Sequence, residues 1–162
     1  MKTAIYDGTP IIKLGDLNTP QVGPKEALLK VHACGICATD LRILNFGHKK
    51  IPQGVKRVLG HELSGEIIAI GEEISWPKIG TRVAVSPNYG CGHCDNCIQG
   101  YTNLCPDYVG LGVVTDGGFA DFMLIPEQSI QQGNVTELPD GLSYDEAAVI
   151  EPLSCAYHGM MD

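Results

Sequence analysis

The sequence has 162 residues, enough for one domain with a substantial hydrophobic core. Its 44% apolar share and 19% charged share are typical of a globular chain and exclude disorder and low complexity. The net charge of −8 argues against nucleic acid or an anionic membrane as a partner, and no apolar run approaches the ~18 residues of a membrane span.

Short strands separated by turn residues are the main elements that the chain predicts. Apolar and β-branched runs between Gly, Pro, Asn and Asp predict strands over residues 2–6, 10–14, 26–32, 64–70, 82–85 and 119–126. Twenty Gly and ten Pro also favour short strands over a helical bundle. We find no sequence repeat and no βαβ alternation, so the pattern predicts a mainly β, barrel-like domain.

Two helices are expected at the edges of this barrel. Thr39-Asp40 offers N-cap chemistry for a short helix over residues 41–46. Residues 47–58, which are basic and contain Pro and Gly, are interpreted as a solvated loop. A second helix over residues 143–158 begins with a capping Ser and acidic residues, and Pro152 is expected to interrupt it.

Four cysteines lie close together in the segment CGHCDNCIQGYTNLC, at positions 91, 94, 97 and 105. Thiolates separated by two residues sit on one tight turn, so three sulfurs can converge from a short loop. A fourth sulfur then completes a tetrahedron, which is the geometry of a structural zinc site with no open position. The spacing therefore predicts a metal site that stabilises the fold and does no chemistry.

Other classes of site share these ligands. Disulfides are disfavoured because the chain opens MKTAIYDGTP, without an apolar signal segment, and because seven cysteines is an odd number. An iron–sulfur cluster is a closer alternative, since Pro106 follows Cys105, but the last gap of seven residues favours a single ion. Nucleic-acid-binding zinc modules have basic surroundings, whereas residues 83–162 contain no Lys or Arg. Unsignalled cysteines also predict a cytoplasmic protein.

A second, catalytic metal site needs three protein ligands and an open position. The candidates outside the four-cysteine segment are Cys37, His61, Glu62 and Glu151, each at a loop or at the end of an element. Taken one at a time they are weak, because a lone Cys is usually a small core residue and a lone His is usually hydrogen-bonded. Their order along the chain makes them stronger candidates.

The ordered runs CGICATD (34–40), GHE (60–62), CGHCDNCIQGYTNLC (91–105) and EPLS (151–154) resemble the zinc-dependent medium-chain dehydrogenase family. They are most similar to its polyol (sorbitol) and threonine dehydrogenase branch. The resemblance implies a GroES-like β-barrel catalytic domain over residues 1–162, with a structural zinc lobe at 88–108. It also implies two zinc ions per chain, and oxidation of a secondary alcohol with hydride transfer to NAD or NADP.

The resemblance also implies roles for individual residues. Cys37 and His61 would be ligands of the catalytic zinc, completed by one or both of Glu62 and Glu151, directly or through water. Thr39 would pass on the proton of the substrate and Asp40 would orient His61. Cys91, Cys94, Cys97 and Cys105 would hold the structural zinc. The implied substrate is a small polyol, sugar alcohol or amino alcohol, and the full-length protein would be a homo-oligomer.

The sequence also departs from the family pattern. Many relatives have a His five residues after the ligand Cys, as the end of a proton relay, and here that residue is Arg42. The G-x-G-x-x-G fingerprint of a nicotinamide-binding Rossmann fold is absent, so this cofactor domain is expected to be missing from the chain. The 162 residues would then be inactive alone. The alternative function is a freestanding zinc-stabilised β-barrel that acts as a binding or scaffold module.

Overall fold

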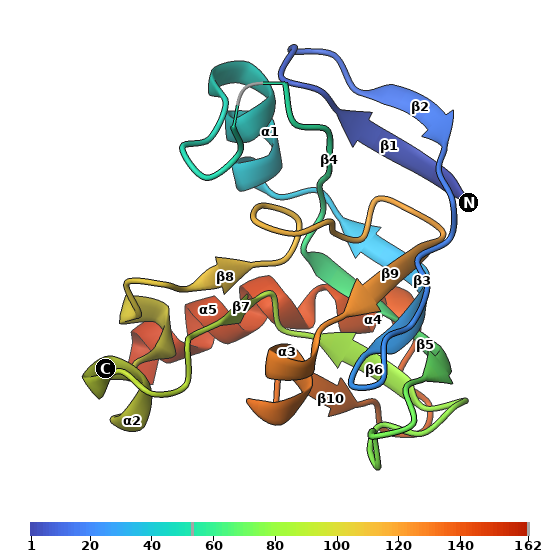
Figure 1. Ribbon diagram of the computed structural model, residues 1–162. Helices are drawn as coiled ribbons and strands as arrows, with labels where there is room; N and C mark the ends of the chain where they lie inside the picture. Colours follow the sequence, from blue (N-terminus) through green and yellow to red (C-terminus); the bar gives the residue numbers. More distant parts are fainter. Residues whose placement is uncertain (53, 162) are drawn as a thin grey trace.

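A five-stranded antiparallel sheet forms the scaffold of the computed structural model, which describes residues 1–52 and 54–161 (Figure 1). Its strands follow the spatial order β10-β6-β5-β3-β9. The bounds are Ala27–Gly35 for β3, Glu62–Ile70 for β5, Arg82–Val85 for β6, Phe122–Ile125 for β9 and Val135–Glu137 for β10. The described part of the chain contains no parallel βαβ unit, as the sequence predicted.

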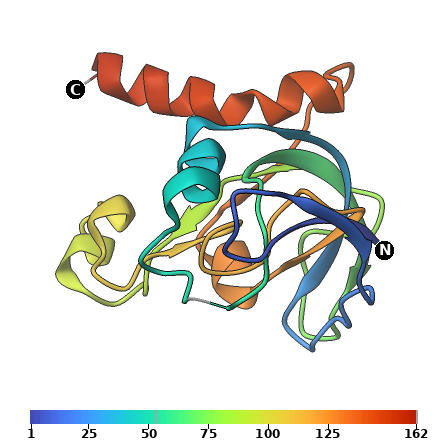
Figure 2. The same cartoon turned by 90° about the horizontal axis from the view of Figure 1, so that it is seen from above.

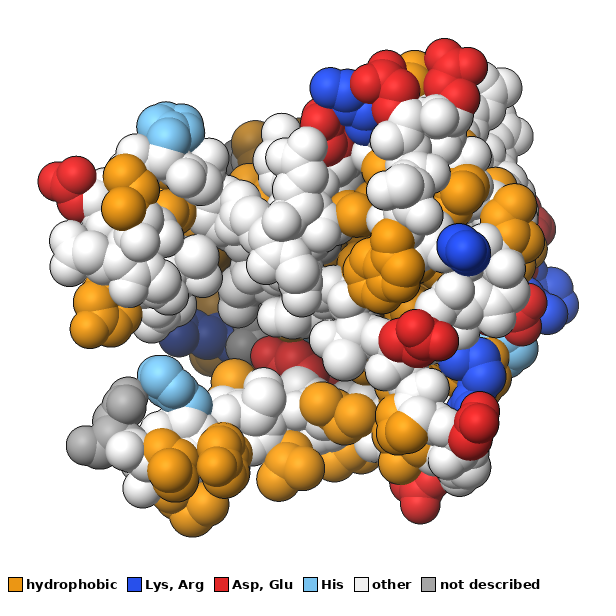
Figure 3. Space-filling model, turned by 90° about the horizontal axis from the view of Figure 1, so that it is seen from below, with side chains coloured by type: hydrophobic (Ala, Val, Ile, Leu, Met, Phe, Trp, Pro, Cys, Tyr) orange, Lys and Arg blue, Asp and Glu red, His pale blue; other side chains and the backbone are white. Residues whose placement is uncertain are grey.

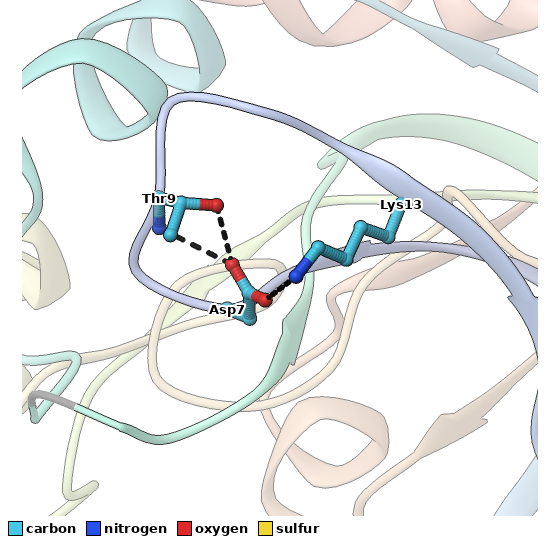
Figure 4. A network of polar contacts seen from close by, with 3 residues as sticks. All are labelled: Asp7, Thr9 and Lys13. Atoms are coloured by element: carbon cyan, nitrogen blue, oxygen red, sulfur yellow. Dashed lines mark hydrogen bonds and ion pairs between the residues drawn. The ribbon is translucent and has the colours of Figure 1, made fainter.

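A three-stranded antiparallel sheet of order β2-β1-β4 lies beside it, with bounds Lys2–Tyr6 for β1, Lys13–Asp16 for β2 and Arg57–Val58 for β4. A bridge between Thr3 and Ala120 connects β1 to the segment before β9. The β1–β2 loop is closed by Asp7, whose carboxylate accepts hydrogen bonds from Thr9 and from Lys13 (Figure 4). Lys13 and Thr9 lower the pKa of Asp7 to about 2.

Two hydrophobic clusters fill the interior. The larger consists of inward-facing residues of the five-stranded sheet and its neighbours, namely Ala27, Leu29, Leu63, Ile67, Val83, Val85, Tyr89, Leu111, Met123, Ile125 and Val135. The smaller lies under the first helix and contains Tyr6, Ile43, Ile51 and Leu59. Alternate residues of β6 and β9 are buried, which is the period-two pattern of half-buried strands.

Helices lie around the scaffold. Their bounds are Ala38–Phe46 for α1, Glu127–Gln131 for α3, Tyr144–Ala148 for α4 and Ile150–Met161 for α5. α4 and α5 lie on one side of the sheets and α3 lies on the other (Figure 2). Figure 2 shows α5 along one edge of the molecule, with α1 beside its middle part. α4 begins at a capping box, in which the Ser143 hydroxyl accepts from the Glu146 N–H at 3.2 Å and the Glu146 carboxylate accepts from the Ser143 N–H.

The predicted interruption of the second helix is present, but it falls at Val149 and not at Pro152. α4 ends at Ala148 with Val149 as its C-cap, and Pro152 lies in the first turn of α5, where a missing N–H costs no helical hydrogen bond. Glu151 therefore belongs to the N-terminal turn of the long helix. No residue of α5 is buried, and large apolar side chains such as Tyr157 and Met160 are exposed.

Smaller corrections concern element bounds. The predicted strand at 10–14 lies instead at 13–16, and the one at 119–126 is only four residues long. The first helix is capped at Cys37, not at Thr39-Asp40. The interpreted loop at 47–58 ends in the short strand β4, while Gln53 lies outside the described residues.

A separate lobe, here called the cysteine lobe (residues 88–110), projects from the scaffold (Figure 1). It contains the short strands β7 (Asn88–Tyr89) and β8 (Val109–Gly110), which pair with each other, the helix α2 (Asp95–Ile98) and the 3-10 turn η1 (Thr102–Leu104). Among the described residues, no helix has the length and apolar character needed to cross a bilayer.

Candidate functional site

Four sulfurs converge inside the cysteine lobe. Cys94 caps the N-terminus of α2, Cys97 lies within α2 and Cys105 follows η1, so each comes from a different part of one compact turn structure. The Sγ atoms of Cys91 and Cys97 are 4.0 Å apart, and those of Cys94 and Cys105 are 3.8 Å apart. All four ligand atoms lie within 4.8 Å of one another. The four cysteines that the sequence singled out are therefore brought together.

These distances fit a zinc tetrahedron and exclude disulfides. A tetrahedron with Zn–S bonds of about 2.3 Å has edges of about 3.8 Å, whereas a disulfide needs an S–S distance of about 2.05 Å. All seven cysteines of the chain are free. Hydrogen bonds from the backbone of His93 and Cys94 lower the pKa of Cys91 to about 6, which favours the thiolate that a metal needs.

The cysteine lobe is attached to the scaffold by polar contacts at its base. Gln132 accepts from the Gly90 N–H at 3.0 Å and donates to the Gly90 carbonyl at 2.7 Å. Asn134 donates to the carbonyl of Asn88 at 2.6 Å. A Cβ on Gly90 would collide with the Cys97 sulfur, so only glycine allows this close approach.

A second contact holds the C-terminal part of the lobe, next to β8. The Lys50 ammonium donates to the Tyr108 carbonyl at 2.6 Å and lies 3.6 Å from the centre of the Tyr108 ring. Lys50 belongs to the segment between α1 and β4. The lobe is thus fixed against the same segment that borders the second group of metal ligands.

That second group consists of Cys37, His61 and Glu62, whose ligand atoms lie within 4.8 Å of one another. Sheet pairing brings them together, because β3 and β5 run antiparallel and Gly35 is the partner of Glu62. Cys37 follows the end of β3 by two residues, and His61 directly precedes β5. The end of β3 and the start of β5, which carry the ligands, therefore lie side by side.

Asp40 ties these two ends to each other. The residue is 4% exposed, and its carboxylate accepts from the Cys37 N–H at 2.9 Å and from the Gly60 N–H at 3.2 Å. Its Oδ1 atom also lies 3.5 Å from Nδ1 of His61, which makes no closer hydrogen bond among the described residues. Because Nδ1 faces Asp40, Nε2 is the ring nitrogen that remains for a metal.

The charge balance at His61 reflects this arrangement. Burial lowers the pKa of His61, but the Asp40 carboxylate and Cys37 outweigh it and raise the pKa to about 9. The buried Asp40 carboxylate is thus the anionic partner of the imidazole. A zinc ion would replace the proton as the positive charge at this position.

Gly60 gives the His61 turn its shape. It has a φ of +91°, in the left-handed region that side chains rarely adopt. A Cβ at this position would lie 2.7 Å from the Phe119 ring and 2.8 Å from the Cys34 sulfur. The Gly of the GHE run is therefore required by both backbone conformation and packing.

A cavity of about 560 Å³ opens beside Cys37, His61 and Glu62. It lies between the scaffold, the cysteine lobe and helix α5, and the hollow between lobe and helix is visible in the space-filling view (Figure 3). Thr39, from the first turn of α1, and Glu151, from the first turn of α5, also line it. Three ligands beside an open cavity is the arrangement of a catalytic zinc site.

Glu151 lies in this cavity but not within the cluster of three donors. Burial and the nearby Glu62 raise the pKa of its carboxyl. One turn further along α5, Cys155 also lines the cavity. A larger, apolar cavity of about 800 Å³ lies between β1, β2 and α1, and Asp40 is the one candidate residue that lines it.

Sequence reasoning missed several polar residues of the cavity. The cavity is also lined by His48, Asn88, Asn103 and Tyr108. Of these four, only Asn103 belongs to the runs that carried the resemblance to a family. They come from the segment after α1 and from the cysteine lobe, which only the folded chain brings beside the ligands. Arg42, at the relay position of many relatives, is exposed and does not line the cavity.

The model of the alcohol dehydrogenase GroES-like domain matches residues 23–140 of this sequence, which is more than half of the chain. The chain belongs to this family. The resemblance expected from the sequence, and the GroES-like, mainly β fold with it, are thereby confirmed.

Two curated relatives come from the branch that the sequence indicated. Sorbitol dehydrogenase of Bacillus subtilis (strain 168) is 41% identical over 98% of this chain, and L-threonine 3-dehydrogenase of Escherichia coli (strain K12) is 39% identical over 91%. The match covers 44% and 42% of those two proteins, so the chain spans less than half of their length.

Solved structures of the alcohol dehydrogenase family share the fold. A zinc-binding dehydrogenase from Sinorhizobium meliloti 1021, bound to NADP, superposes with a TM-score of 0.85 at 34% identity. The match covers 98% of this chain and 44% of that structure. This chain therefore has the fold of the matched part of a zinc-binding dehydrogenase that was solved with NADP.

Proposed function

We propose that the chain is the catalytic domain of a zinc-dependent NAD(P) alcohol or polyol dehydrogenase that oxidises a secondary alcohol. The observation that carries the proposal is the convergence of Cys37, His61 and Glu62 beside an open cavity. Membership of the alcohol dehydrogenase GroES-like family supports it. A binding module would need no such incomplete ligand set.

Cys37 and His61 would hold the catalytic metal, with Glu62 or Glu151 supplying a carboxylate oxygen, directly or through a water molecule. Bound zinc would polarise the alcohol oxygen, and a bound nicotinamide would accept the carbinol hydride. Thr39 lines the cavity beside Cys37, where its hydroxyl would accept the proton of the substrate and pass its own outward. Asp40, at 3.5 Å from Nδ1, would hold the His61 ring in its metal-binding orientation.

The donor set suggests the class of substrate. Carboxylate oxygens make a metal site harder than one with a second thiolate, and such a site suits a substrate that chelates through two oxygens. A polyol, a sugar alcohol or an amino alcohol has this chemistry, and the names of the two curated relatives agree with it. Equal activity on simple alcohols and vicinal diols would contradict this inference.

The cysteine lobe would bind a second zinc through Cys91, Cys94, Cys97 and Cys105. All four donors are protein thiols, so no position remains for a substrate. Its task would be to stiffen the wall of the cavity to which Tyr108 and Asn103 belong.

Hydride transfer would also need a nicotinamide-binding domain, which residues 1–162 do not supply. We therefore propose that these residues are inactive alone, and that the full-length protein is a cytoplasmic homo-oligomer that resembles its relatives in having a cofactor domain. The relatives are more than twice as long as the matched part, which supports a separate cofactor-binding domain in the full-length protein.

The test is an assay of the full-length, zinc-loaded protein. NAD and NADP are offered in turn with sorbitol, L-threonine, a vicinal diol and a simple secondary alcohol, and nicotinamide reduction is followed by absorbance. We expect reduction with at least one polyol or amino alcohol, abolished by Cys37→Ser. No reduction with any of these alcohols would overturn the proposal in favour of the binding or scaffold module.

A further inference from the structure

His48 lines the cavity, although it is not one of the proposed metal ligands. Helix α1 begins directly after Cys37 and ends at Gly47, so its two ends carry the metal ligand and His48 respectively. His48 is half-buried and is part of the lining of the same cavity as Thr39 and Glu62. It also lines a smaller cavity of about 340 Å³ beside Tyr6 and Pro52. The far end of the helix thus places a histidine at the border of the substrate space.

The orientation of this ring is fixed by the backbone that follows it. Nδ1 of His48 accepts a hydrogen bond from the Lys50 N–H at 3.2 Å, and the His48 carbonyl accepts from the Ile51 N–H at 2.9 Å. An Nδ1 atom that accepts carries no hydrogen, so the proton of the neutral ring is on Nε2. No described residue accepts a hydrogen bond from Nε2.

The surroundings keep the ring neutral. Burial lowers the pKa of His48, and the positive charges of Lys49, Lys50 and Arg42 lower it further. A neutral ring whose Nε2 already holds the proton donates at that atom and does not accept. His48 therefore does not replace the relay histidine that Arg42 displaces, and its chemistry is that of a hydrogen-bond donor.

We propose that His48 is a specificity-determining residue whose Nε2–H donates a hydrogen bond to a second oxygen of the substrate, away from the reacting carbinol. The matching ligands are alcohols that carry a further hydroxyl or a carboxylate, and simple monohydric alcohols lack the partner. This inference rests on the proposed function, since it assigns a role at the same site. A donor left without an acceptor would penalise the simple alcohol.

The test compares two substrates in the full-length, zinc-loaded protein, a polyol such as sorbitol and a simple secondary alcohol such as 2-butanol. His48→Asn keeps an acceptor for the Lys50 N–H, because an Asn side chain makes the same two-residue turn, but its amide N–H donors sit on a shorter side chain than Nε2 and reach less far into the cavity. His48→Leu removes both the acceptor and the donor. His32→Asn is the matched control, because His32 stacks on Tyr144 at 4.2 Å between ring centres and does not line the cavity.

We expect both His48 variants to lower kcat/KM for the polyol about tenfold or more. The values for 2-butanol should stay within about twofold of the wild type, and His32→Asn should change neither. The inference is overturned if both substrates lose equally, or if His48→Asn keeps the full preference for the polyol. Failure of the proposed function looks different, because the wild-type protein would then oxidise neither alcohol.

Discussion

The two groups of candidate metal ligands are built in opposite ways. The cysteine lobe takes all four donors from residues 91–105, and its own short elements, α2 and η1, position them. The cavity takes Cys37 from the end of β3, and His61 and Glu62 from the start of β5, so its geometry depends on strand pairing. The first group is saturated by protein, and the second faces about 560 Å³ of open space.

This difference teaches where function can reside in such a domain. A locally built, four-thiolate site is closed and contributes to the fold, whereas a site assembled from separate strands can leave one side open. Asp40 holds the open site together, because its buried carboxylate accepts hydrogen bonds from the backbone of Cys37 and of Gly60. The following predictions test this contrast.

Cys37→Ser should have the largest effect, and it should be an effect on activity alone. We expect kcat/KM of the full-length protein to fall by about a thousandfold or more, which corresponds to about 4 kcal/mol of transition-state stabilisation. Zinc content should fall from two to one per chain, measured by elemental analysis. A melting temperature that dropped as far as that of a cysteine-lobe variant would remove the distinction between the sites.

Cys97→Ser should instead affect stability first. Loss of one thiolate opens the tetrahedron, and we expect the free energy of unfolding to fall by about 3 kcal/mol. Urea unfolding measures the loss, and limited proteolysis should then cut within the cysteine lobe. Cys155→Ser is the control, because its thiol is exposed on α5 and should leave the unfolding midpoint unchanged. An unchanged midpoint for Cys97→Ser would contradict a structural role.

Asp40→Asn should have an intermediate effect at the cavity and none at the lobe. Removing the carboxylate charge beside Nδ1 of His61 should weaken zinc binding at this site by about ten- to a hundredfold. Competition with a chromogenic chelator measures the affinity of each site. Asp140→Asn, an exposed change, serves as the control. Equal weakening of both zinc ions would show that Asp40 acts on the whole fold.

The metal-free protein should show opposite pH dependences for the two sites. The folded pKa of His61 is raised to about 9 from 6.5, so its contribution is complete below pH 6.5 and is lost as pH rises towards 9. At the cysteine lobe the folded pKa of Cys91 is lowered to about 6 from 9.0, while the pKa of the neighbouring Cys94 thiol is raised to about 12, so between pH 6 and 9 the stability contribution of this pair rises with pH.

Chemical unfolding of the chelator-treated protein between pH 6 and 9 checks this prediction. Relative to the wild type, His61→Asn should be most destabilised near pH 6, by about 2 kcal/mol at most, with a deficit that shrinks towards pH 9. The deficit of Cys91→Ser should be largest near pH 9. Parallel profiles for the two variants would refute opposite electrostatics at the two sites.

The same contrast explains what the sequence could predict. The spacing of Cys91, Cys94, Cys97 and Cys105 predicted a convergence that local turns produce, and the structure brings these sulfurs together. Cys37, His61 and Glu62 converge through the β3–β5 register, which spacing alone cannot reveal, so they were found through resemblance to a family. His48 and Tyr108 approach the cavity through tertiary packing and gave no signal in the sequence.

Element bounds failed where a local rule was applied to the wrong residue. The sequence predicts a helix break at Pro152, but the break lies at Val149 and Pro152 belongs to the first turn of α5. Thr39-Asp40 was read as the N-cap of α1, whereas Cys37 occupies that position and Asp40 reaches back to its N–H. In both cases the residue type was informative, but the helix begins at a different residue from the one that the local rule indicates.

The zinc content and the lability of each zinc test the central claim most directly. In the full-length protein we expect two zinc ions per chain, one removed readily by a chelator together with activity, and one retained in the cysteine lobe. Cys37→Ser should lack only the labile ion. A single, tightly held zinc that no substitution in the cavity affects would contradict the account, as would iron with visible absorbance in the four-cysteine site.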